Sequence, residues 1–163
     1  MKFSEALEKL NKSDIFCEWS RNNKNCYLVH GFLMLDPNVK QEWQIGFYDP
    51  GKDNITTFNV NSKITKNPES EVFKEEKRIG ELEPDNINFF FDDACEKAEK
   101  LQKEKYPRHL PVKKIFVLQK LSGRQVWNIT FVTQTFKTLN MKFDSKTGEI
   151  ISDQLISLFR IEK

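Results

Sequence analysis

Two histidines are the residues of this chain best suited to acid–base or metal chemistry. His30 lies within an apolar run, residues 26–35, and His109 lies in the loop between Pro107 and Pro111. A histidine acts as a metal ligand or a general base only when partner groups converge on it, and neither one has such a partner at a suitable spacing. The sequence therefore predicts structural roles for both, with no metal site and no catalytic residue.

The cysteines, carboxylates and glycines also lack the spacing of a known active site. The three cysteines are odd in number and form no Cys-x-x-Cys pair, so we expect free, buried thiols at Cys17, Cys26 and Cys95. Many carboxylates lie between residues 69 and 99, but no pair is set apart as an acid and a base, which favours a solvated acidic face. No glycine-rich phosphate loop or GxSxG pattern occurs among the six glycines. These features predict a protein that is not an enzyme and carries no cofactor.

A net charge of +2 hides a strongly uneven distribution of charge along the chain. Residues 69–99 hold 11 acidic and 4 basic side chains, whereas residues 100–146 hold 11 basic and 2 acidic ones. Six of the basic residues lie on or beside the strands expected in the second half: Lys113, Lys114, Lys120, Arg124, Lys137 and Lys142. A basic sheet surface of this kind could bind nucleic acid or an acidic partner. The alternative is that neighbouring acidic and basic elements neutralise each other.

The first half of the chain reads as helix followed by strands. Apolar residues at helical spacing predict a helix over residues 3–11, and Ser13 with the following Asp provides a cap for a second short helix. Three β-prone runs separated by turn signals then predict a three-strand meander at residues 26–35, 42–48 and 55–60.

The second half repeats this order after a polar connection. Residues 62–88 are rich in Lys, Glu, Asn and Pro, and we expect a linking segment there with one short helix or edge strand at most. An amphipathic helix is predicted over residues 92–106, where Pro107 ends it. Strands are predicted at residues 112–121, 125–133 and 138–144. The last segment, residues 150–163, fits either a strand or a terminal helix.

Two sequence patterns recur in the same order in both halves. Residues 93–98 resemble residues 5–10 at an offset of 88, and residues 127–131 (WNITF) resemble residues 43–47 (WQIGF) at an offset of 84. The alternation places both tryptophans on an apolar strand face, which predicts core packing. Such recurrence predicts an α+β fold of two tandem lobes, each a helix with an antiparallel sheet, that join their sheet edges or pack face to face. The expected boundaries are residues 1–61 and 89–163, with residues 62–88 between them, and the lobes could form one compact domain.

The second half resembles a known family through its tryptophan strand and the turn that follows. After Trp127 and its strand, residues 144–149 read D-x-x-T-G-E, and residues 89–152 as a whole resemble a PepSY domain. A weaker copy covers residues 3–60, where the D-x-x-T-G-E turn is missing. The resemblance implies a cystatin-like module with a helix packed on a sheet, which binds or inhibits other proteins and does not catalyse. It implies no particular functional residues, and members of the family are usually exported.

Composition and length set the broad class of the protein. The chain has 163 residues, of which 38% are hydrophobic and 14 are Phe, enough to bury a core. The acidic start of the chain and the lack of a long apolar stretch predict a cytoplasmic protein without a membrane partner. We therefore expect a non-enzymatic, regulatory module that binds a protein or peptide through a sheet edge or concave face. The alternatives are a nucleic-acid-binding protein that uses the basic second half and a small-ligand carrier with a pocket between helix and sheet.

Overall fold

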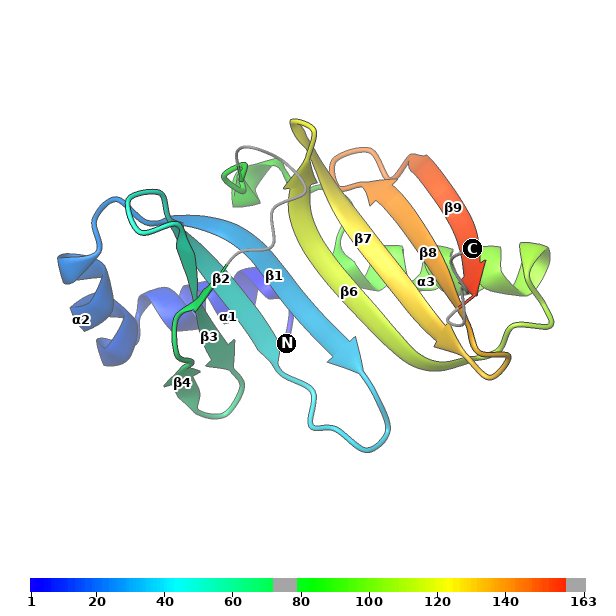
Figure 1. Ribbon diagram of the computed structural model, residues 1–163, viewed down its shortest axis with the longest axis horizontal. Coiled ribbons are helices and arrows are strands. Elements are labelled where there is room, and N and C mark those ends of the chain that lie inside the picture. Colours follow the sequence, from blue (N-terminus) through cyan, green and yellow to red (C-terminus); the bar gives the residue numbers. More distant parts are fainter. Residues whose placement is uncertain (72–78, 158–163) are drawn as a thin grey trace, which may run out of the picture.

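The computed structural model describes residues 1–71 and 79–157, and the strands found there share one sheet (Figure 1). The strands are β1 (Tyr27–Leu35), β2 (Trp43–Asp49), β3 (Asn54–Val60), β4 (Ile64–Lys66), β5 (Ser70–Glu71), β6 (Pro111–Leu121), β7 (Arg124–Thr133), β8 (Lys137–Asp144) and β9 (Ile150–Ser157). Their order is β4-β3-β2-β1-β6-β7-β8-β9, β5 pairs with β3, and every pairing is antiparallel. The expected α+β class is confirmed.

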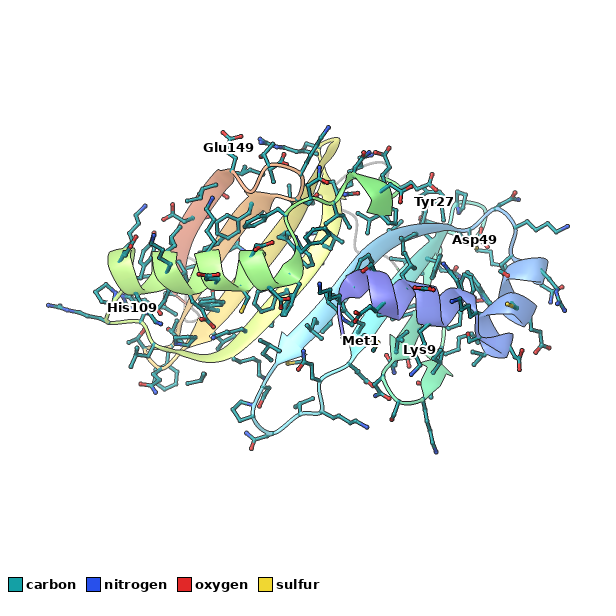
Figure 2. The ribbon with its side chains drawn as sticks, turned by 180° about the vertical axis from the view of Figure 1, so that it is seen from behind. Met1, Lys9, Tyr27, Asp49, His109 and Glu149 are labelled. Atoms are coloured by element: carbon teal, nitrogen blue, oxygen red, sulfur yellow. The ribbon has the colours of Figure 1, made fainter. Side chains whose placement is uncertain are left out.

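Three α-helices of the described residues cover one face of the sheet. They are α1 (Phe3–Asn11), α2 (Asp14–Asn22) and α3 (Phe91–Lys105), and a single 3₁₀ turn, η1 (Pro84–Asn86), precedes α3. Seen from behind, α1 and α3 both lie in front of the sheet, α1 over the strands of the first half and α3 over those of the second (Figure 2). No described helix covers the opposite face, so the molecule has two layers. None of the described helices is long and apolar enough to cross a membrane.

The helices begin and end where the local sequence predicts. Glu5 accepts a hydrogen bond from the Lys2 backbone N–H at 2.7 Å, and the Ser13 hydroxyl accepts one from the Phe16 N–H at 3.3 Å, so each cap satisfies a backbone donor. Helix α3 ends just before Pro107, which cannot continue a helix. The apolar stripe of α1 is buried against the sheet, as its spacing requires.

Two tryptophans stand at the centre of a core that spans both halves of the chain. Trp43 on β2 and Trp127 on β7 are each 1% exposed, and their ring centroids are 6.4 Å apart. The indole N–H of Trp43 donates to the Met1 carbonyl at 3.0 Å, and that of Trp127 donates to the Phe89 carbonyl at 2.8 Å. Each carbonyl lies two residues before a helix, so each tryptophan ties its strand to the start of a helix. Core packing of both is confirmed.

The strands of the two halves meet at β1 and β6. These strands pair from His30 opposite Gln119 to Leu35 opposite Lys114, which joins the two meanders edge to edge. Gly31, near the middle of this pairing, has no side chain because the ring of Phe3 occupies the space: an added Cβ would lie 2.3 Å from Phe3 Cε2. The glycine thus lets α1 approach the sheet closely.

The structure decides two features of the element order. The second short helix expected after Ser13 forms as α2, and residues 150–157 form the strand β9, one of the two alternatives for that segment. The turn before β9 accounts for this, since Gly148 adopts a φ of 73° and reverses the chain onto β8. Residues 158–163, the rest of that segment, lie outside the described residues. The expectation for the connection, one short helix or edge strand at most, is wrong: its described residues form β4, β5 and η1, and residues 72–78 lie outside the described part.

Candidate interaction surface

The last strand, β9, has an outer side that is open to pairing. Its inner side pairs with β8, whereas from Ile150 to Ile156 its outer side pairs with no described strand. Eight residues long, β9 contains one ionisable residue, Asp153, and neither Lys nor Pro. The opposite edge of the sheet is formed by β4 and β5, which have only three and two residues and lie beside Lys63 and Pro68. Short strands, lysines and prolines protect sheet edges, so β9 is the edge suited to strand addition.

A groove of 570 Å³ runs between α3 and the start of β9. Its apolar part consists of Phe89, Leu101 and Ile150, and Ile150 is 44% exposed. Six charged residues surround this part: Asp93, Glu96, Lys97, Lys100, Glu104 and Lys105. Figure 2 shows α3 crossing the strands of the second half, so the groove lies beside the open edge of the sheet.

Two of the groove lysines link α3 to β9 and to the turn that precedes it. Lys97 donates to the Gly148 carbonyl, and Lys105 donates to the Asp153 carboxylate at 2.6 Å. The Tyr106 hydroxyl also donates to Asp153. The hydrogen bonds from Lys105 and Tyr106 lower the pKa of Asp153, and the same carboxylate raises the pKa of both partners. These contacts fix the width of the groove.

The turn into β9 is held by Asp144. Its carboxylate accepts hydrogen bonds from the Lys146 and Thr147 backbone N–H groups at 2.8 and 2.9 Å and from Arg124 Nε at 2.7 Å. Burial by itself would raise the pKa of Asp144, but the guanidinium and the two backbone donors outweigh burial and hold the pKa at about 2. The aspartate of the D-x-x-T-G-E pattern thus positions the start of β9.

The six basic residues singled out from the sequence do not form one patch. Four of them form ion pairs within the chain: Lys113 with Asp36, Lys114 with Glu99, Lys120 with Glu83 and Arg124 with Asp144. Lys137 and Lys142 form no ion pair with a described residue. Lys114 lies over the buried Phe131 ring on the helix side of the sheet, so the adjacent Lys113 points to the other side. The structure therefore divides these cations between two faces and neutralises most of them.

The two histidines occupy different environments. The His30 ring lies over Gly46 of the neighbouring strand, where an added Cβ would be 2.1 Å from His30 Cε1. Burial lowers the pKa of His30 to about 4, so the ring is neutral at physiological pH. His109 is partly exposed, and its Nδ1 lies 2.7 Å from the Thr135 hydroxyl.

The cysteines are free, as expected, but half-buried where full burial was expected. Burial raises the pKa of Cys26 and of Cys95 to about 11, which keeps both thiols protonated and poorly nucleophilic at neutral pH. Within residues 1–71 and 79–157, no three His, Cys, Asp or Glu residues converge to hold a metal ion.

The sheet face without helices is a second exposed surface. One cross-strand row on it runs through Gln44, Phe32, Val117, Asn128 and Lys142, all partly exposed. Amides on this face bond to each other across strands, as when Asn140 Nδ2 donates to Asn128 Oδ1 at 2.7 Å. The polar groups of this pair are therefore partly satisfied within the chain, in contrast to the backbone groups of the β9 edge.

Comparisons with known proteins identify a fold and no family. No protein-family model matches the chain, and no curated protein matches it significantly. A crystal structure of a "putative lipoprotein" from Clostridium difficile 630 is similar, with a TM-score of 0.57 and 18% sequence identity over 87% of this chain and 90% of that chain. At this identity the likeness shows a shared α+β fold alone. The resemblance to PepSY domains therefore stays a prediction.

Proposed function

We propose that this chain is a non-enzymatic protein that binds an extended segment of a protein partner by strand addition to β9. The observation that carries the proposal is the outer side of β9, which from Ile150 to Ile156 pairs with no described strand and lies next to the groove along α3. A strand added there would take up the backbone N–H and C=O groups of the edge, and every second side chain would point toward α3. Backbone hydrogen bonds would supply affinity and the groove would supply selectivity.

The groove favours a segment with apolar and basic residues in alternation. Its apolar part offers burial to apolar side chains. Of its cations, Lys97 and Lys105 are already engaged by groups of this chain, whereas Glu96 and Glu104 bond to no described residue. The acidic groups that are left to interact with a ligand would attract basic side chains of the bound segment.

The matching parts of the two halves support a duplicated origin for the module. The strand order β3-β2-β1-β6-β7-β8 is symmetric about the β1–β6 pairing, and Trp43 and Trp127 make matching hydrogen bonds to the starts of two helices. We therefore keep two tandem, PepSY-like lobes as part of the proposal. The edge pairing of β1 with β6 is the same kind of contact that a partner strand would make with β9.

Nucleic-acid binding is less well supported, because four of the six candidate cations already have acidic partners. A small-ligand carrier would use the same groove, whose 570 Å³ falls within the size of ligand sites, but the groove is open along the sheet edge. For location, three free cysteines favour a reducing compartment such as the cytoplasm, and cell fractionation tests this.

Panning of a random peptide library against the full chain tests the proposal. We expect enrichment of alternating apolar and basic peptides whose binding protects β9 amides from hydrogen exchange. An Ile150→Glu substitution, at a 44% exposed groove position, should abolish binding, whereas Ile15→Glu, at a 36% exposed position on α2, should preserve it. The proposal is wrong if no peptide is enriched, if protection lies away from β9, or if both variants bind equally.

A further inference from the structure

The loops at one end of the sheet carry exposed apolar side chains. This end, called the apolar end below, consists of residues 36–42, 106–112 and 134–136, which follow β1, lead into β6 and follow β7. They lie along the lower edge of the molecule in Figure 1. The exposed side chains are Val39 at 49%, Leu110 at 51%, Val112 at 48% and Phe136 at 64%.

The loops at the opposite end have a different composition. They span residues 23–26, 50–53, 122–123 and 145–149, and none of these positions holds a large exposed apolar side chain, although Ile150 and Ile151 follow the last of them at the start of β9 with 44% and 38% exposure. Among these loops and the strand ends beside them, the more exposed apolar side chains gather at the apolar end. Their concentration there indicates a contact surface.

The three loops of the apolar end are connected to one another. Val39 and Val112 line the same depression of 420 Å³, together with Met34 and Pro111. The Gln134 N–H donates to the Leu110 carbonyl at 3.0 Å, and His109 and Thr135 are hydrogen-bonded. The apolar side chains thus belong to one surface and not to separate loops.

Cations outnumber carboxylates among the charged groups at the apolar end that form no ion pair with a described residue. Asp36 forms an ion pair with Lys113 at 3.2 Å, and Glu42 accepts a hydrogen bond from the Asn61 side-chain amide. By contrast Lys40, Arg108 and Lys137, the residue of β8 next to this end, form no ion pair with a described residue, and Lys40 makes only a long hydrogen bond, 3.4 Å, to the Ser62 hydroxyl. An anionic partner surface would therefore be attracted to this end.

We propose that the apolar end docks on an anionic lipid membrane. Apolar side chains on protruding loops, interleaved with cations, suit the boundary between headgroups and acyl chains, whereas the centre of a protein interface is depleted of charge. Val39, Leu110 and Val112 enter this boundary, and Arg108 and Lys137 contact the anionic headgroups. The depression lined by Val39 and Val112 takes up part of an acyl chain. This is a peripheral contact and needs no membrane-spanning segment, which is why the lack of a long apolar stretch does not reveal it.

Vesicle sedimentation with the full chain tests the proposal, with phosphatidylcholine vesicles that contain or lack phosphatidylserine. We expect binding only to the anionic vesicles, and a loss of about fivefold in the partition coefficient for each of Arg108→Gln and Lys137→Gln. The matched controls, Lys24→Gln and Lys146→Gln, remove exposed cations from the opposite end and should leave binding unchanged.

A second variant separates the apolar contribution from the charge. Replacing Val39, Leu110 and Val112 by Ser should remove the binding to anionic vesicles that persists at high salt, and circular dichroism should show an unchanged fold because all three side chains are about half exposed. The proposal is overturned if anionic vesicles do not sediment the chain, or if the controls lose binding as the apolar-end variants do. It is also overturned if the triple variant loses a protein contact, such as self-association, and retains its vesicle binding.

Discussion

Mild acidification, from about pH 7.5 to about pH 5, should destabilise this protein through His30. The ring is packed over Gly46, and burial lowers its pKa to about 4 from 6.5. Below pH 6.5 this histidine is protonated in the unfolded chain, whereas in the folded chain it becomes protonated only when pH falls to about 4. The stability contributed by the neutral ring is therefore fully present above pH 6.5 and is lost as pH falls toward the folded-state pKa.

The size of the effect follows from the two pKa values. Each pKa unit corresponds to about 1.4 kcal/mol, so the whole shift is worth at most about 3 kcal/mol, of which about 2 kcal/mol is lost by pH 5. Carboxylates do not obscure this interval. The pKa values of Asp36, Glu99, Asp144 and Asp153 are all lowered in the folded state, so their contributions are lost only below the ordinary carboxyl range.

Urea unfolding at about pH 7.5 and about pH 5 measures the effect. The chain has only two histidines, so His30→Gln is the test and His109→Gln is the matched control. We expect the free energy of unfolding to fall by about 2 kcal/mol in the parent chain and in His109→Gln, and to stay nearly constant in His30→Gln. An equal fall in His30→Gln, or its loss in His109→Gln, would refute the burial of a neutral His30 ring.

Two further predictions concern the contacts that set the fold. Gly31→Ala should lower the free energy of unfolding in urea by about 1–3 kcal/mol, because the new Cβ meets the Phe3 ring. Adding Phe3→Leu to this variant should recover part of the loss. Strictly additive costs of the two substitutions would mean that the two side chains do not compete for the same space. Asp144→Ala should cost about 2–3 kcal/mol at neutral pH, because it leaves two backbone donors and a guanidinium without their acceptor. It should also reduce the loss of stability that the parent shows as pH falls from 3.8 toward 2, because the contribution of this carboxylate is then missing. A cost under about 0.5 kcal/mol would contradict the role of this turn.

Periodicity and turn chemistry predicted most helices and strands because those signals are local. The stripe of α1 and the alternation around Trp43 both depend on side chains a few residues apart, and the structure confirms them. The pairing of β1 with β6 could not be predicted in the same way. Nothing in the sequence of residues 30–35 or 114–119 indicates which strand each one pairs with. Gly31 marks a position where the helix approaches the sheet closely, but this can be recognised only when the position of Phe3 in three dimensions is known.

The candidate site was harder to predict because it depends on contacts between distant segments. Ile151 and Leu155 fit both a strand and a helix, so the sequence left the nature of β9 open, and with it the existence of an edge. The low charge of residues 150–157 was the one feature of the sequence that could have indicated an unprotected sheet edge. For the basic residues the sequence predicted a surface that the structure does not form. They are close together in sequence, but Lys114 pairs with Glu99 on α3 and Lys113 pairs with Asp36 after β1.

The two proposed surfaces lie at different places along β9 and are compatible. The groove meets β9 at Ile150, its first residue, whereas β9 ends beside Lys137, next to the apolar end. A chain docked on a membrane through Val39, Leu110 and Val112 would therefore hold the groove end of β9 away from the lipid, accessible to a partner segment. If both proposals hold, peptide capture should persist on vesicles, and substitutions at one surface should leave binding at the other unchanged. That independence follows from the antiparallel topology, which places the first residue of β9 and the apolar end at opposite ends of the sheet.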